Sequence, residues 1–189
     1  IVYTRAATGI DSPRIKVEVH LSNGLPSFKL VGLAETAVQE ARERVRSALI
    51  NCGFEFPGRR ITVNLAPADI PKTGGRYDLA IALGLLIALG LLPQQAVDNY
   101  EVIGELGLNG QLRTVSGLLP AAMRCAEDEH LMLLPEGNRD NIQLVDGLKY
   151  IAVESLMQAF LHFSKQKPLQ VSIAQCDVAF TRVSPKWDD

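Results

Sequence analysis

The sequence has few cysteines and histidines, and none of them form a recognisable metal-binding or disulfide pattern. Its 189 residues include three cysteines, Cys52, Cys125 and Cys176. They lie far apart without a CxxC pair, which argues against a disulfide framework and against a zinc site. The three histidines are equally scattered: His20, His130 and His162. We therefore expect no metal site and a reducing, cytoplasmic setting.

Motifs of nucleotide-binding and hydrolytic enzymes are also missing. No glycine precedes a lysine, so the phosphate-binding GxxxxGK[ST] loop is absent. Gly104, Gly107 and Gly110 have a spacing that does not fit a dinucleotide fingerprint. No GxSxG elbow is present, although a Ser-His-Asp site stays open because a sequence does not show spatial proximity. We expect this chain by itself to hold no cofactor and to hydrolyse no ATP.

No apolar run is long enough for a membrane span. The longest, Leu79 to Leu92, has 14 residues, whereas a spanning helix needs about 20. The amino terminus lacks a basic stretch followed by an apolar one, so no signal peptide is predicted. The chain begins at Ile1 without a methionine and is interpreted as a soluble fragment of a longer protein.

Charge is unevenly distributed along the chain. Residues 1–77 contain eleven Lys and Arg against seven Asp and Glu, which is +4, whereas residues 78–166 contain five against eleven, which is −6. A basic first half could present one face to nucleic acid. Solvated surface charge explains the same excess, and the sequence does not separate the two.

The first half predicts a hairpin, a helix and a strand. Residues 15–21 alternate between apolar and polar side chains, Asn23-Gly24 predicts a tight turn, and residues 27–31 read as the returning strand. Thr36 and Gln39 form a capping box for a helix that ends at Gly53. Its polar face carries interleaved arginines and carboxylates, which could contact phosphates or only solvent: Glu40, Arg42, Glu43, Arg44 and Arg46.

The second half predicts strands that alternate with helices. A buried helix over residues 78–92 ends before Pro93, and Asn109-Gly110 predicts a second hairpin. Ser116 is expected to cap the next helix, and Ser155 with Gln158 the last one. Between them we expect strands at 131–134 and 150–153 and a short helix near 139–145. This alternation is typical of parallel strands, so we predict a mixed α/β (α+β) domain over residues 1–165 and a linker over 166–189.

The stretch Asn64 to Asp78 has the geometry of a functional site. It joins the strand Ile61 to Leu65 to the most apolar segment of the chain. Two prolines forbid helix within it, and Gly74-Gly75 relaxes the backbone there. A stiff charged loop between a strand and a buried helix predicts either a catalytic or a binding site.

Several motifs in the chain are similar to one family. They are Arg5 to Ala7, Gly32 to Thr36, Glu40 to Ala48, Asn64 to Asp69, Gly74 to Leu79 and Gly104 to Leu106. On these residues the chain resembles the amino-terminal domain of the ComM/YifB family of Mg-chelatase-like AAA+ ATPases. The resemblance covers nearly all of residues 1–165 and implies the ribosomal S5 domain 2-like fold of the Lon proteolytic domain.

Lon enzymes use a serine-lysine dyad, which this chain lacks. The resemblance places Arg76 at the position of the nucleophile and Leu119 at that of the lysine. An arginine does not attack a carbonyl and a leucine takes no proton. The family likeness therefore predicts a non-proteolytic Lon-like domain with no catalytic residues.

The resemblance also implies the role of the whole protein. It would be a cytoplasmic homo-hexamer that binds single-stranded or branched DNA and drives branch migration in natural transformation and recombination. ATP and Mg would bind an AAA+ module that follows this chain. Our candidates for DNA contact are Lys72, Arg76, Arg59 and Arg60, because cations on a glycine loop and at a strand start could reach phosphates.

Three alternatives stay open. Arg76 could instead form an ion pair with Asp78 or Asp69. The chain could be a Lon-type peptidase with a displaced dyad, for example Ser116 with Lys72 as base. It could also belong to a Mg-chelatase-like ATPase chaperone that remodels a metal-inserting partner.

Overall fold

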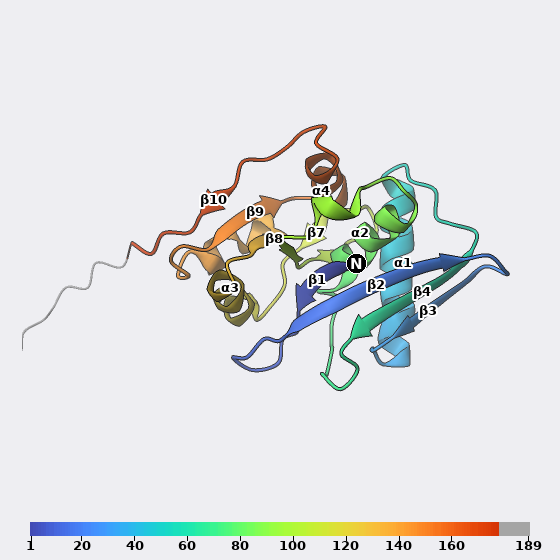
Figure 1. The fold of residues 1–189 in the computed structure, drawn as a ribbon, viewed down its shortest axis with the longest axis horizontal. Coiled ribbons are helices and arrows are strands. Elements are labelled where there is room, and N and C mark those ends of the chain that lie inside the picture. Colours follow the sequence, from blue (N-terminus) through green and yellow to red (C-terminus); the bar gives the residue numbers. More distant parts are fainter. Residues whose placement is uncertain (178–189) are drawn as a thin grey trace, which may run out of the picture.

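The computed structural model describes residues 1–177, whose strands build one large mixed sheet. Eight of them follow the order β10-β9-β8-β5-β1-β2-β4-β3, with β10 and β9 on the left of Figure 1 and β4 and β3 on the right. Their bounds are Val2–Arg5 (β1), Arg14–Ser22 (β2), Ser27–Val31 (β3), Arg60–Ala66 (β4), Tyr100–Val102 (β5), Leu131–Pro135 (β8), Lys149–Val153 (β9) and Ser172–Ile173 (β10). The short strands β6 (Glu105–Leu106) and β7 (Leu112–Arg113) form a separate hairpin.

Helices cover both faces of the β8 and β9 part of the sheet. Within the described range they are α1 (Glu35–Asn51), α2 (Asp78–Ala88), α3 (Leu118–Glu127), α4 (Leu156–Phe163) and the 3₁₀-helices η1 (Gln94–Ala96) and η2 (Glu136–Ile142). On β8, Leu133 belongs to the core shared with α1, α2 and α4, whereas Met132 and Leu134 belong to the core shared with α3 and η2. Because successive strand residues point to opposite faces, the two groups of helices lie on opposite sides.

Strands β2 and β3 do not pair with each other, so the expected hairpin across Asn23-Gly24 is wrong. β4 lies between them, antiparallel to β2 and parallel to β3. Val19 of β2 and Leu30 of β3 both pair with Val63 of β4. A turn signal specifies only that the chain reverses, whereas the choice of neighbouring strand depends on apolar partners far away in the sequence.

The second hairpin and the parallel half of the sheet are confirmed. Glu105 pairs with Arg113 in the antiparallel hairpin, and Gly110 in its turn has a φ of +85°. β5 is parallel to β1 and β8, and β8 is parallel to β9. The short helix expected near 139–145 is the 3₁₀-helix η2, which begins earlier, at Glu136.

Two of the three expected helix caps are wrong. α1 begins at Glu35, one residue before Thr36, and has no side-chain cap. α3 begins at Leu118 after Gly117, which has a φ of +65°, and Ser116 does not cap it. In both places the residue directly before the helix has no polar side chain that could cap it: Ala34 before α1 and Gly117 before α3.

The third cap is confirmed. Ser155 Oγ accepts a hydrogen bond from the Gln158 amide at 3.1 Å at the start of α4. The buried helix α2 is also present, although it ends at Ala88 and not at Leu92. Propensity and local spacing were sufficient at these two positions.

The mixed α/β class is confirmed, while the finer likeness to the Lon proteolytic domain stays a prediction. Strand β10 lies beyond residue 165 and pairs antiparallel with β9. Ala174, just after it, is fully buried. Part of the expected linker therefore belongs to the sheet, and the domain division itself stays a prediction. The linker residues 178–189 lie outside the described part.

Candidate nucleic-acid interface

Lys72 lies in the loop between β4 and α2 and is buried, contrary to its expected exposure. Its side chain is 6% exposed. Nζ donates hydrogen bonds to the carbonyl oxygens of Pro67 at 2.5 Å and Ile70 at 2.9 Å. Burial lowers the pKa of Lys72. The ammonium group thus holds the loop's own backbone and is not available at the surface.

Arg76, further along the same loop, is buried as well. It is 4% exposed, and within residues 1–177 none of its three guanidinium nitrogens has a hydrogen-bond partner. Loss of hydration lowers the pKa of Arg76. The alternative of an ion pair with Asp78 or Asp69 is wrong, because no such pair is formed in this part of the chain.

Asp78 is paired with a different arginine. Arg44 of α1 donates to its carboxylate through Nε at 2.6 Å and Nη2 at 3.1 Å, and the Leu106 amide donates at 3.1 Å. Burial raises the pKa of Asp78 to about 6, although the Arg44 guanidinium opposes this rise. One carboxylate therefore connects α1, the start of α2 and β6.

Within residues 1–177, no serine-lysine pair forms near Arg76 and Leu119, the two positions matched to the Lon dyad. Arg76 and Ser116 line one pocket of about 510 Å³, and Lys72 does not line it. Leu119 lines a neighbouring hollow together with Ser116. Because both hydrogen bonds of the Lys72 ammonium go to loop carbonyls, the alternative dyad of Ser116 and Lys72 has no geometric support.

Arg59 lies in an exposed groove whose lining residues the sequence did not group together. The groove, of about 620 Å³, lies between α1, the start of β3 and the segment before β4. It is lined by three exposed arginines, Arg42, Arg46 and Arg59, and we call it the basic groove. Three partly buried aromatic rings line it too: Phe28, Phe54 and Phe56.

Part of this groove could be predicted from helical spacing. Arg42 and Arg46 are four residues apart and so lie on one side of α1, whereas Arg44 lies on another side and pairs with Asp78. The Arg46 guanidinium carbon is 5.8 Å from the centre of the Phe56 ring. A single carboxylate, Glu55, also lines the groove. That Arg59 lies close to Arg42 and Arg46 follows from the tertiary structure and cannot be predicted from helical spacing.

Arg60 is exposed but lines a different hollow. That hollow has a volume of about 390 Å³ and is shared with Lys29 of β3 and Thr62 of β4. Of the four cations assigned to DNA from the sequence, the structure thus leaves Arg59 and Arg60 at the surface and buries Lys72 and Arg76.

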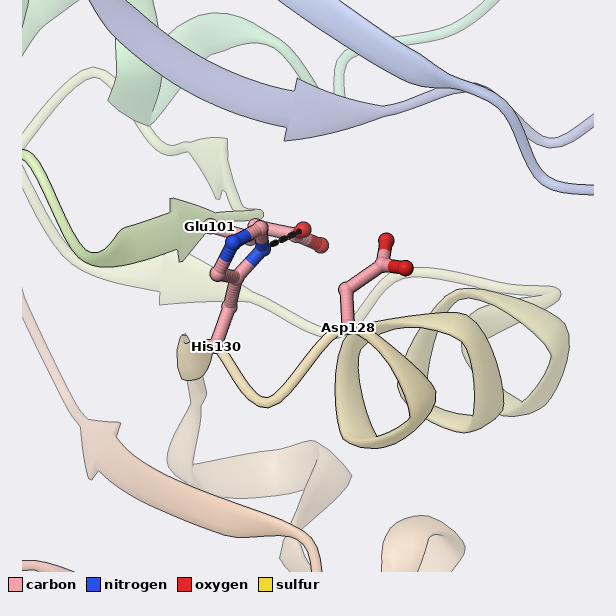
Figure 2. Close-up of side chains that lie close together, drawn as sticks. All are labelled: Glu101, Asp128 and His130. Atoms are coloured by element: carbon pink, nitrogen blue, oxygen red, sulfur yellow. Dashed lines mark hydrogen bonds and ion pairs between the residues drawn. The ribbon is translucent and has the colours of Figure 1, made fainter.

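A second cluster of charged groups lies at the centre of the sheet. Figure 2 shows Glu101 of β5 accepting a hydrogen bond at 2.8 Å from Nδ1 of His130, with Asp128 beside them. Ligand atoms of the three residues lie within 4.8 Å of one another, so His130 does have close potential metal-ligand neighbours, contrary to expectation.

Arg5 of β1 balances the charge of this cluster. It donates to Glu101 at 2.5 Å and 2.8 Å and also pairs with Asp128. A cation entering the cluster would have to displace this buried guanidinium. The arrangement is therefore an ion-pair network that joins β1 to β5 and to the end of α3, and we assign no metal to it.

Comparison with known proteins places the chain in a family. A family model described as subunit ChlI of Mg-chelatase matches residues 17–138. The competence protein ComM of Haemophilus influenzae is 44% identical over 177 residues, which is 93% of this chain. The chain belongs to the ComM/YifB family. Further ComM/YifB relatives are YifB of Escherichia coli, 51% identical over 78% of the chain, and YifB of Salmonella typhimurium, 50% identical over 93%.

This ComM/YifB chain spans about a third of the length of these relatives. It covers 29% of the Escherichia coli protein and 35% of each of the other two. Among residues 1–177 no helix combines the length and the apolar character that crossing a membrane requires.

Proposed function

We propose that the chain is a non-proteolytic, Lon-like domain of a cytoplasmic ComM-type ATPase that binds DNA. The whole protein would form a hexamer and drive branch migration during transformation and recombination. ATP and Mg would bind an AAA+ module outside this sequence, since residues 1–189 contain no GxxxxGK[ST] loop. The name of the Haemophilus influenzae relative, a competence protein, supports this proposal.

The basic groove is the structural feature that best supports DNA binding by this domain. Three exposed arginines can neutralise phosphates, and three aromatic rings beside them offer apolar surface on which bases stack. Arginine and aromatic side chains without a fixed array of base-reading groups suit a single strand of any sequence. Arg60 and Lys29, in the neighbouring hollow, would extend the basic surface.

Salt titration of the full-length protein tests this. We expect Arg42→Ala, Arg46→Ala and Arg59→Ala together to weaken binding of single-stranded DNA. The negative slope of log K against log salt should become shallower by about 2, at roughly 0.7 per phosphate contact. Lys72→Ala and Arg76→Ala should leave the slope unchanged because both residues are buried. Lys149→Ala, an exposed cation on β9, is the matched control. An unchanged slope in the triple variant would exclude the groove.

The match to subunit ChlI of Mg-chelatase favours a second candidate, an ATPase chaperone that remodels a metal-inserting partner. The two candidates predict different partners for the full-length protein. Copurification of a chelatase-like subunit, together with an absence of DNA affinity, would favour the chaperone. The peptidase alternative would be supported only if the chain cleaved casein and Ser116→Ala abolished this cleavage.

A further inference from the structure

The pocket lined by Arg76 and Ser116 is polar on nearly every side. Its walls come from the loop before α2, from β6, from the segment between β7 and α3, and from η2. The polar side chains are Thr73, Arg76, Glu105, Thr114, Ser116, Asn138 and Asn141. Gly74 and Gly75 leave part of the wall as bare backbone. No residue of this pocket lines the basic groove.

Arg76 differs from the other buried cations in the described chain. Arg5 is paired with two carboxylates, and Lys72 with two carbonyl oxygens. Arg76 is as deeply buried, and none of its guanidinium nitrogens has a partner within residues 1–177. A buried charge without a counter-charge strongly destabilises a protein, because hydration is lost and nothing replaces it. The fold therefore retains a charge that lacks its partner.

The neighbouring groups indicate which partner would fit. A guanidinium pairs bidentately with carboxylate or phosphate oxygens. Glu105, whose carboxylate also lines the pocket, pairs with Arg113 at 3.6 Å and not with Arg76. This carboxylate repels a second negative charge, so a monoanion fits better than a dianion. Hydroxyl groups of Thr73, Thr114 and Ser116 can donate to the same oxygens.

We propose that this pocket binds a carboxylate group, either of a small molecule or of a peptide's carboxyl terminus, through Arg76. The guanidinium nitrogens are covered in this structure, so binding requires the Arg76 side chain to turn towards the pocket that it lines. The proposal is independent of DNA binding, and its failure would leave the basic groove untouched.

Thermal unfolding of the full chain in sodium acetate and in sodium chloride, at equal ionic strength, tests the proposal. We expect acetate to raise Tm saturably by about 2–4 °C relative to chloride. Arg76→Met should raise Tm in chloride, because it removes an unpaired buried charge, and should abolish the acetate effect. Lys149→Met, which changes an exposed cation on β9 outside the pocket, should keep it.

Further binding measurements decide which class of ligand the pocket takes. Equilibrium dialysis of labelled acetate should show at least about tenfold weaker binding to Arg76→Lys, which keeps the charge but loses the bidentate fork. Short peptides with a free carboxyl terminus that bind more tightly than acetate, while their amides do not bind, would assign a peptide terminus. Equal effects of acetate and chloride on the unmodified chain, an undiminished acetate effect in Arg76→Met, or a stronger effect of phosphate than of acetate would each overturn the proposal.

Discussion

Charged residues of the loop between β4 and α2 have different partners and therefore different roles. Lys72 bonds to the loop backbone, and Asp78 pairs with Arg44 and with the Leu106 amide. Arg76, only two residues from Asp78, has no partner in the described chain. Burial without a partner within residues 1–177 distinguishes Arg76 from the structural ion pairs around it.

The elevated pKa of Asp78 predicts how stability depends on pH. Its pKa is 3.8 in an unfolded chain and about 6 here, so the native state binds the proton more tightly. The free energy of unfolding should therefore fall by about 3 kcal/mol in total through this group as pH rises from about 3 to about 7, with about 2 kcal/mol of that fall between pH 4 and pH 6.

Urea denaturation at several pH values between 4 and 7.5 measures this effect. Asp78→Asn cannot titrate, so its stability should depend less steeply on pH than that of the unmodified chain. The comparison uses the slope, because the amide also changes the pairing of Arg44. Glu40→Gln, which alters an exposed partner of Arg44, should keep the original slope. Parallel pH profiles for Asp78→Asn and the unmodified chain would contradict the prediction.

At the scale of elements, α2 is the helix around which the first core is built. Residues 78–86 of the helix are all buried. It packs on β1 and β2 of the sheet and against α1 and α4. Gly84 permits the close approach to the sheet, since a Cβ there would lie 2.6 Å from Cγ2 of Val19 on β2. An apolar surface all round the helix is thus matched by neighbours on every side.

Gly84→Ala should destabilise the protein by about 1–3 kcal/mol through overpacking, although alanine favours a helix by about 1 kcal/mol. Chemical denaturation measures the difference. Val19→Ala added to this variant should recover part of the loss, because it removes the colliding methyl groups. Gly58→Ala is the control, since no atom lies within 4 Å of its added Cβ, and should change stability by less than about 0.5 kcal/mol. Equal stability of Gly84→Ala and the unmodified chain would refute this packing argument.

At the scale of the whole molecule, one sheet has two halves that differ in whether neighbouring strands run parallel or antiparallel. β2, β4 and β3 form its mixed half, and β5, β8 and β9 its parallel half, with β1 between them. The basic groove lies at the β3 end, and β10 forms the opposite edge. A partner bound in the groove would therefore leave the β10 edge free for other contacts.

A chain that ends at residue 165 should be less stable than one that ends at residue 177. The shorter chain loses β10, the buried Ala174 and the hydrogen bonds of Ala174 with Gly147 and Leu148, each 2.9 Å long. We expect a loss of about 1–3 kcal/mol in urea denaturation, because these hydrogen bonds, those of Lys167 with Leu161 and of Leu169 with His162, and some apolar burial disappear. Equal stability would instead place the domain boundary at 165, as the sequence predicts.

Local patterns were sufficient for most elements. Alternation in β2, the all-round apolar run of α2, Asn109-Gly110 and the Ser155 cap each depend on residues close in sequence, whose geometry the backbone dictates. The mixed α/β class follows from the same patterns. Family motifs within residues 1–79 and at 104–106 were also sufficient to assign the ComM/YifB family, which the comparisons confirm.

Strand neighbours and the burial of charge were decided only by the tertiary structure. β4 separates β2 from β3 because pairing is a choice among distant segments, which a turn does not determine. Likewise, a glycine loop with cations reads as an exposed binding loop, yet Lys72 and Arg76 are covered, while Arg42 and Arg46 of α1 meet Arg59. The sequence by itself determined where most of the chain is helical or extended, though not strands β1 and β10, because those preferences are local. Which charges of the described residues face water, pair with one another or are buried without a partner depended on packing between segments far apart in the chain.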